Sequence, residues 1–383
     1  MKSELFIFVF SLCLLSACEK SGTGTEQELD AIVFSISDVQ VDIDSRSGPV
    51  NQLPDGSSFG VFGYCLAQIA PDNTELNNSS GSLYWDQKKI LCRPHLFYKQ
   101  EVTYSGGACS YSPVKNWYDQ VNYQYSFFAY YPYGDEYFSF NTDESTLGAP
   151  EVVFSIPDIS TGESLNIEYE NENGSSVTES YSVLDDALVP DAMVAQTIDV
   201  TRAGGVASLD FLHILTGLNF QVNNYNVMED ESGGQVPGNP VTIHSLVLAG
   251  DFYKSVEINF DSGYDFTDDT FNGAYVLVSQ DIEVGGLESV SGIGGKTLLM
   301  VSNLTKTSGE DAYIGNLKLA VTYSFGDTVR RTKVFSRPDN FLPAGGTIYT
   351  AQLNFIGNSF VLNFIVDNDS KWEDGRDSDI TFE

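Results

Sequence analysis

"AIVFSISDVQVDI" (residues 31–43) alternates apolar and polar side chains with the period of two that is typical of a β-strand. Its apolar residues form two sets that would face opposite sides: Ile32, Phe34 and Ile36, then Val39, Val41 and Ile43. Because the phase changes at Ser37-Asp38, we expect a bulge or a break between two short strands. The segment therefore predicts β-structure near the start of the folded chain.

The same alternation recurs along the rest of the chain, whereas helical periodicity is scarce. Clusters of Gly, Asn, Asp and Pro separate the expected strands, which lie at 57–66, 123–132, 206–212, 218–225, 242–250, 255–260, 273–279, 316–325, 330–336, 348–356 and 359–367. We expect one short helix near "LDFLHILTG" (209–217), where Gly217 would end it. Many short strands separated by turn residues predict an all-β protein built from β-sandwich domains.

Changes in composition divide the chain into two tandem domains. The segment 158–189 is acidic and rich in Ser, and we expect a long loop there. "PDAMVAQTIDV" (190–200) then predicts a last strand that leads into a link, and a second run of alternation begins at Val206. These features predict an N-terminal β-sandwich domain at 31–198 and a C-terminal one at 199–383.

An apolar run from Leu5 to Leu15 precedes both domains. It is too short to span a bilayer, which takes about 20 residues, but it suits the apolar region of a secretory signal. The string "LSAC" that ends at Cys18 resembles a bacterial lipobox. We therefore expect a signal peptide at 1–17, lipidation of Cys18 and a tether at 18–30. The alternative is an ordinary signal peptide with a chance cysteine.

The charge balance excludes one class of partner. The chain has 53 acidic and 19 basic residues, and its formal net charge is −34. Such a surface repels nucleic acid, because nucleic-acid binding depends on Lys and Arg that neutralise phosphates. Beyond the signal region the cysteines are Cys65, Cys92 and Cys109, so at most one disulfide can form within the chain. Their spacing matches no zinc pattern, and we expect them to be structural.

No catalytic or cofactor motif is present in the sequence, and we predict no enzyme, no cofactor and no metal. His213 lies among apolar residues and is expected to be a hydrogen-bonded core histidine. The acidic segment 367–379 is similar to a calcium loop, but Lys371 and Trp372 stand at its fifth and sixth positions, where an oxygen ligand and Gly are needed. Glycan binding stays open as an alternative function, because tryptophans can stack on sugars; the candidates are Trp85, Trp117 and Trp372.

Several of these stretches together resemble a known family. In chain order they are "SFGVFGY" (58–64), "YSPVKNWYDQVNYQYSFFAYYP" (111–132), "PDAMVAQT" (190–197), "VASLDFLHILTGLNFQV" (206–222) and a Trp-Gly segment at 372–375. The series resembles the fimbrillin family, the lipoprotein subunits of type V pili in Bacteroidota, including its Mfa-like branch. The resemblance implies two transthyretin-like β-sandwich domains and a location on the outer membrane, at the cell surface and in the fimbria.

The resemblance also implies an assembly mechanism. An Arg-directed, trypsin-like protease cuts a loop after the first strand, the strand leaves, and a C-terminal strand of the next subunit fills its groove. Arg46 follows the alternating segment and would be the processing site, so that residues 18–46 leave together; alternatively it is a solvated loop arginine. The candidate donor residues are Phe360, Leu362, Phe364 and Val366, or Ile380 and Phe382.

The implied partners are other pilin subunits, that protease, the outer membrane through the lipid, and surface ligands of a host or of other bacteria. Two alternatives stay open at this stage. One is an anchor or tip pilin that does not polymerise. The other is a monomeric surface lipoprotein that binds glycans.

Overall fold

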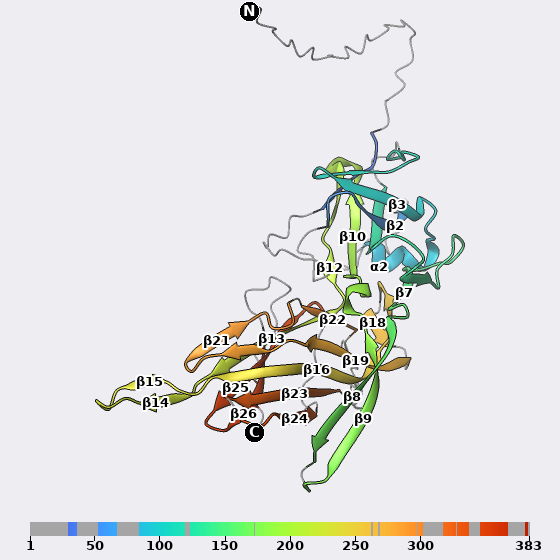
Figure 1. The fold of residues 1–383 in the computed structure, drawn as a ribbon. Coiled ribbons are helices and arrows are strands. Elements are labelled where there is room, and N and C mark those ends of the chain that lie inside the picture. The colour runs from blue at the N-terminus through green and yellow to red at the C-terminus, as the bar shows by residue number, and fades with distance from the viewer. Residues whose placement is uncertain are drawn as a thin grey trace, which may run out of the picture.

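The computed structural model is an elongated assembly of β-sheets (Figure 1). It describes residues 30–36, 53–66, 84–118, 123–171, 173–261, 263–266, 269–295, 297–301, 317–326, 328–336, 345–366 and 380–381. Besides strands β1 to β27, these ranges hold one five-residue helix, α2 (Tyr84–Lys88), and three 3-10 turns, η1 (Lys89–Leu91), η2 (Asp186–Leu188) and η3 (Arg202–Gly204). None of the helices in these ranges has the length and apolar character that crossing a bilayer requires. The prediction of an all-β protein is confirmed.

A six-stranded sheet forms the centre of the N-terminal part. Its strands are, in spatial order, β12 (Leu212–His213), β10 (Met193–Thr201), β5 (Gln124–Tyr131), β2 (Ser57–Leu66), β3 (Phe97–Ser105) and β4 (Ala108–Ser110). One face of this sheet is covered by a two-stranded parallel layer, β1 (Val33–Ile36) and β11 (Val206–Leu209). Apolar side chains of both layers form one buried cluster, in which Phe59, Phe97 and Phe127 are among the largest members.

The C-terminal part contains two sheets, one of seven and one of six strands. One has the order β24 (Arg331–Ser336), β23 (Lys318–Phe325), β16 (Val241–Tyr253), β19 (Thr270–Val278), β9 (Ser176–Leu184) and β8 (Ser160–Glu170), with β20 (Ile282–Val284) beside β16. The other has the order β21 (Glu288–Ser291), β13 (Thr216–Asn224), β25 (Ile348–Ile356), β26 (Ser359–Val366) and β27 (Ile380–Thr381), with β22 (Leu298–Met300) beside β13. A hairpin of β14 (Val227–Glu229) and β15 (Gln235–Pro237) projects from this end (Figure 1).

A four-stranded sheet connects the two parts. Its order is β18 (Gly263–Phe266), β17 (Ser255–Asn259), β7 (Glu151–Ser155) and β6 (Phe138–Phe140). Strand β7 comes before residue 198 and strand β17 comes after it, yet the two pair over their whole length. The rings of Phe128 and Phe260, 5.2 Å apart, also meet across that position. The division at 198/199 lies within β10 and stays a prediction, and the pairing of strands crosses it.

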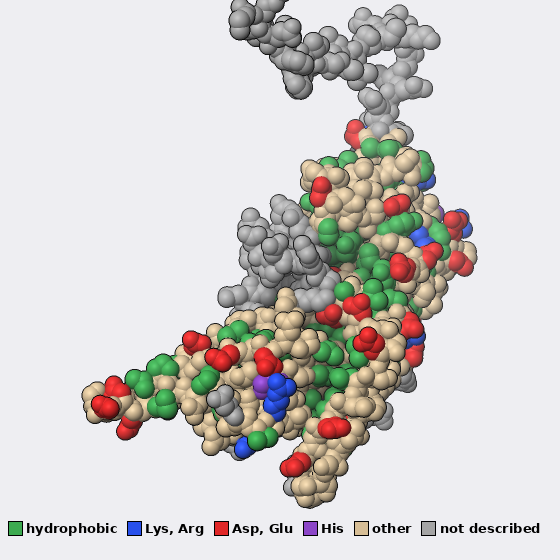
Figure 2. Space-filling model, viewed as in Figure 1, with side chains coloured by type: hydrophobic (Ala, Val, Ile, Leu, Met, Phe, Trp, Pro, Cys, Tyr) green, Lys and Arg blue, Asp and Glu red, His purple; other side chains and the backbone are tan. Residues whose placement is uncertain are grey.

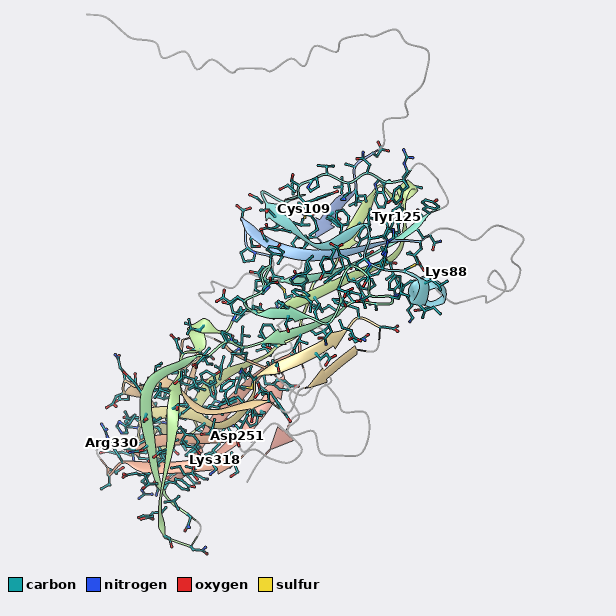
Figure 3. All side chains as sticks on the ribbon, turned by 90° about the vertical axis from the view of Figure 1, so that its right-hand side faces the viewer. Lys88, Cys109, Tyr125, Asp251, Lys318 and Arg330 are labelled. Carbon is teal, nitrogen blue, oxygen red and sulfur yellow. The ribbon has the colours of Figure 1, made fainter. Side chains whose placement is uncertain are left out.

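The segment 158–189 is not a long loop, as its acidic, Ser-rich composition suggested. It contains the hairpin of β8 and β9. Ile167 and Tyr181 of this hairpin are buried in one cluster with Ala249 of β16 and Ala320 of β23, while most of the polar residues between them are exposed. Glu179 accepts a hydrogen bond of 2.5 Å from Lys318, which is labelled in Figure 3, and so connects the hairpin to β23. Few apolar residues are enough here, because one face of the hairpin is solvated.

The expected helix near 209–217 is also absent. Instead, β11 ends at Leu209, β12 pairs with β10, and β13 starts at Thr216. The apolar run there supplies core residues to different sheets: Leu209, Phe211, Ile214 and Leu215 are all buried. Tertiary packing therefore overrides the local helical pattern, as it often does in short apolar runs.

We expect Gly60 to be essential for the packing of β2 against β5. A Cβ atom added at Gly60 would overlap the ring of Tyr130, which is itself fully buried. Gly60→Ala should therefore lower the free energy of unfolding by about 1–3 kcal/mol, the usual cost of overpacking. Chemical denaturation would measure this, with Gly204→Ala as the control because a Cβ atom there meets nothing within 4 Å. Equal stabilities of the two variants would contradict this packing.

Candidate functional site

The first described segment, 30–36, has two backbone neighbours. Its strand β1 pairs in parallel with β11, from Val33 opposite Val206 to Ile36 opposite Leu209. Just before β1, residues 30–32 run antiparallel to 115–117. There the backbone N–H of Ile32 donates to the carbonyl of Lys115 at 2.8 Å, and the N–H of Trp117 donates to the carbonyl of Asp30 at 2.9 Å. The backbone of residues 30–32 is therefore held by 115–117, and that of Val33–Ile36 by β11.

The side chains of β1 alternate between core and solvent. Ile32 and Phe34 are 1% and 2% exposed, whereas Val33 between them is 46% exposed. The ring of Phe34 lies 5.3 Å from that of Phe127 and 5.7 Å from those of Phe97 and Tyr111. Full burial of one such side chain is worth about 1.5–3 kcal/mol. We call the rings of Phe97, Tyr111 and Phe127, with the backbone of 115–117 and 206–209, the first-strand socket.

Tyr111 closes the socket from the side. Its hydroxyl donates a hydrogen bond of 2.7 Å to the carbonyl of Ile32. Burial raises the pKa of this phenol, so it stays protonated and keeps its donor at neutral pH. Asp30 and Arg202 form an ion pair of 3.6 Å at the start of the strand, which contributes little because the carboxylate is exposed. The specific contacts of β1 are therefore the buried rings and the backbone hydrogen bonds.

The residues predicted to form the donor strand in assembly divide into two groups. Phe360, Leu362 and Phe364 are buried in the C-terminal part, and β26, which also contains Val366, pairs with β25 along its entire length. Ile380 lies in β27, which pairs with β26 at two positions only. Phe382 lies outside the described residues, as do the predicted lipid site Cys18 and the predicted processing site Arg46.

The predicted chemistry of the histidines and cysteines can be compared with the structure. His213 forms a hydrogen bond of 2.9 Å with Asp191, in agreement with the prediction of a hydrogen-bonded histidine. Within the described residues, no group of His, Cys, Asp and Glu has the arrangement of a metal site. Cys65, Cys92 and Cys109 form no disulfide with one another. Burial raises the pKa of Cys65 and of Cys109 to about 11, which disfavours the reactive thiolate.

Two of the three tryptophans considered for sugar stacking belong to the core. Trp85 packs on Tyr64 and Phe128, and Trp117 packs on Tyr125. Both indole rings are almost fully buried, so neither offers a face to a ligand. Trp372 lies outside the described residues.

Sequence reasoning missed both backbone neighbours of the segment 30–36. The pairing with β11 joins residues about 170 positions apart, and the antiparallel contact with 115–117 joins residues more than 80 positions apart. Local periodicity carries no signal for either. The one available hint was the alternation in "VASLDFL" (206–212), which predicted a strand there without its partner.

The sequence matches the family described as fimbrillin-like over residues 50–322, which is more than half of the chain. The chain belongs to the fimbrillin-like family. A search among proteins of curated function finds no match. Among solved structures, a fimbrial protein from Bacteroides vulgatus is similar at a TM-score of 0.53 and 16% identity, over 87% of this chain and 98% of that one. That likeness concerns the fold.

Two further solved structures are similar at lower scores. One is a candidate cell adhesion protein from Bacteroides uniformis, with a TM-score of 0.41, 12% identity and coverage of 88% of this chain and 98% of that one. The other is a fimbrial assembly protein from Parabacteroides distasonis, with a TM-score of 0.37, 10% identity and coverage of 92% and 99%. At these TM-scores neither likeness carries an argument. The resemblance to the fimbrillin family is confirmed by the family match.

In this fimbrillin-like protein, Phe34→Ala should lower the free energy of unfolding by about 3–5 kcal/mol, because it removes a buried ring from the socket and leaves a cavity. Val33→Ala is the matched control, since Val33 belongs to the same strand and is largely exposed. Urea denaturation of the uncut chain measures both. Similar losses for the two variants would contradict the inward orientation of Phe34.

The thiols of the fimbrillin-like protein should react slowly while it is folded. With a pKa of about 11, Cys65 and Cys109 are about 0.1% thiolate at pH 8, whereas an unfolded cysteine with a pKa near 8.5 is about one quarter thiolate. We expect alkylation by iodoacetamide to be at least about 100-fold slower in the folded chain than in urea. Mass spectrometry of the labelled peptides gives both rates, and equal rates would show that burial does not protect these thiols.

Proposed function

We propose that this protein is a structural subunit of a cell-surface fimbria that assembles by exchange of its first strand and contributes to adhesion. The position of β1 carries the proposal. A strand that pairs with β11, is anchored to 115–117 through residues 30–32 and buries Phe34 among three rings leaves an open groove when it departs. Such a groove has unpaired backbone groups and empty apolar sockets, which a strand from another subunit can satisfy together. Membership of the fimbrillin-like family supports this function.

Hydrolysis of the peptide bond after Arg46 by an Arg-directed protease would release β1. We propose that the released piece begins at a lipidated Cys18, so that one cut removes both the lipid and the strand. The lipid would first hold the precursor at the outer membrane, where the protease meets it. The cut subunit would then be free to join a fimbria at the cell surface.

The donor in this proposal is the C-terminal arm that contains Ile380 and Phe382, rather than β26. Withdrawal of β26 would strip Phe360, Leu362 and Phe364 from the subunit's own core, at a cost of several kcal/mol. Withdrawal of the arm costs much less free energy, because β27 pairs with β26 at two positions only. In addition, the sequence Ile380-Thr381-Phe382 repeats the apolar spacing of Ile32-Val33-Phe34. The same two residue types would thus enter the socket at the same separation.

A contact of this kind joins two different surfaces. The groove of one subunit receives the arm of the next, so that one end of the growing chain keeps a free groove and the other end a free arm. Because this head-to-tail contact is heterologous and does not close on itself, it generates a filament.

The test uses the soluble mature chain, residues 18–383 with Cys18→Ser, treated with an Arg-specific protease. We expect a new N-terminus at residue 47 by intact mass and sequencing, followed by a ladder of SDS-resistant oligomers on gels. Arg46→Ala should prevent both the cut and the ladder. Phe382→Asp should leave the cut unchanged and abolish the ladder, because a charge cannot enter the apolar socket.

One control variant makes this result specific. Phe335→Asp changes a half-buried aromatic residue in β24, far from the arm in sequence, and tests whether any new charge blocks assembly. A cut at residue 46 without oligomers would overturn strand exchange, and resistance of Arg46 to the protease would favour an uncut anchor subunit.

A further inference from the structure

A cleft of about 540 Å³ opens in the N-terminal part between the segment 93–100 and residues 113–115. The polar side chains that line it are those of Arg93, His95, Gln100, Lys115, Glu144 and Ser145. Its floor includes Leu96 and Phe97, which are almost fully buried. The volume is within the usual range for sites that hold a small molecule, about 300–1,000 Å³.

The charge of this cleft is unusual for the chain. The visible face of the protein carries scattered acidic side chains (Figure 2), and the net charge is −34. Among the other basic residues that the structure describes, Lys89, Lys99, Arg202, Lys254, Lys318 and Arg330 pair with carboxylates, whereas Lys88, Arg331 and Lys333 form no ion pair with a described residue. Arg93 and Lys115 form no ion pair within the described residues, and both line this cleft. Two cations are thus available to an acidic ligand at one place.

The walls of the cleft are held in position by hydrogen bonds. The side-chain amide of Gln100 donates to the carbonyl of Ser112 at 3.2 Å and so connects β3 to the segment that contains Lys115. The backbone of Lys115 is fixed in turn by its hydrogen bond from Ile32. The hydroxyl of Tyr98 donates a hydrogen bond to the carbonyl of Thr142. This bond holds the segment that contains Glu144 next to β3. A site whose walls are already ordered loses little entropy when a ligand binds.

The hydrogen-bond acceptors in the cleft further restrict the chemical class of the ligand. His95 Nδ1 lies 2.8 Å from the carbonyl of Arg93, and because a carbonyl can only accept, this nitrogen carries the proton. In the neutral ring, Nε2 is then an acceptor. Glu144 adds a carboxylate, which accepts from hydroxyl groups and repels a simple anion. A ligand with one acidic group and several hydroxyls satisfies the cations and these acceptors together.

We propose that this cleft binds an acidic saccharide through its carboxylate or sulfate group. The guanidinium of Arg93 presents a planar pair of donors to that group, and Lys115 adds a second positive charge. Glu144, His95 and Ser145 receive the sugar hydroxyls, and the face of Tyr98 and the ring of Pro113 provide apolar surface. The proposal names a ligand class for adhesion and does not require that the subunit polymerises.

Calorimetry on the uncut mature chain, with Cys18→Ser, tests the proposal independently of strand exchange. The probes are sialyllactose, a disaccharide with a terminal glucuronic acid, and lactose sulfate, with lactose as the neutral control. We expect at least one acidic probe to bind at least tenfold more tightly than lactose. The comparison among the three distinguishes a carboxylate ligand from a sulfated one.

Variants locate the binding. Arg93→Ala and Lys115→Ala should each lower the affinity for the tightest-binding acidic probe at least tenfold. Arg330→Ala removes the same charge from an exposed position in the C-terminal part and should leave that affinity unchanged. Higher salt should also weaken binding, because the attraction is electrostatic. Equal binding of lactose and all acidic probes, an unchanged affinity in both cleft variants, or tight binding of a Glu-rich peptide in place of the sugars would overturn the proposal.

Discussion

Backbone pairing of the first segment, through residues 30–32 with 115–117 and through Val33–Ile36 with β11, is the constraint on which the N-terminal part depends. Only a few residues are involved, yet they connect β11 to the segment 111–117 and cover the apolar face of a six-stranded sheet. Without them, Phe97 and Phe127 would face water, and the backbone of 115–117 would lose its partners. Because a buried backbone group without a partner is costly, the socket requires a strand, either its own or another of similar pattern.

The same region contains the acidic-saccharide cleft. Lys115 contributes its carbonyl to the first strand and its side chain to the cleft, and Phe97 packs against Phe34 while it forms part of the cleft floor. The strand that fills the socket therefore also supports one wall of the ligand site. In a fimbria, that support would come from the neighbouring subunit, so assembly and ligand binding would share one structural element.

The core of the protein is more continuous than the composition suggests. One apolar cluster extends from Phe62 and Phe128 of the N-terminal sheet to Tyr323 and Phe355 of the C-terminal ones. The four-stranded sheet, in which β7 and β17 pair, connects the two parts through backbone hydrogen bonds as well. Composition marks where polar residues accumulate, but it does not show which strands pair across that position.

The sequence by itself determined the all-β class, the position of many strands and the family. The predicted strand at 57–66 coincides with β2, most of whose residues are buried, because a short apolar run bounded by turn residues is a local signal. The alternation in residues 31–43 also placed Ile32, Phe34 and Ile36 on one face of a strand. Only the tertiary structure decided that Phe34 meets Phe97, Tyr111 and Phe127, that 158–189 contains a hairpin, and that Arg93 and Lys115 line one cleft. These contacts join residues far apart in the chain, and the period of a strand carries no information about which distant strand lies beside it.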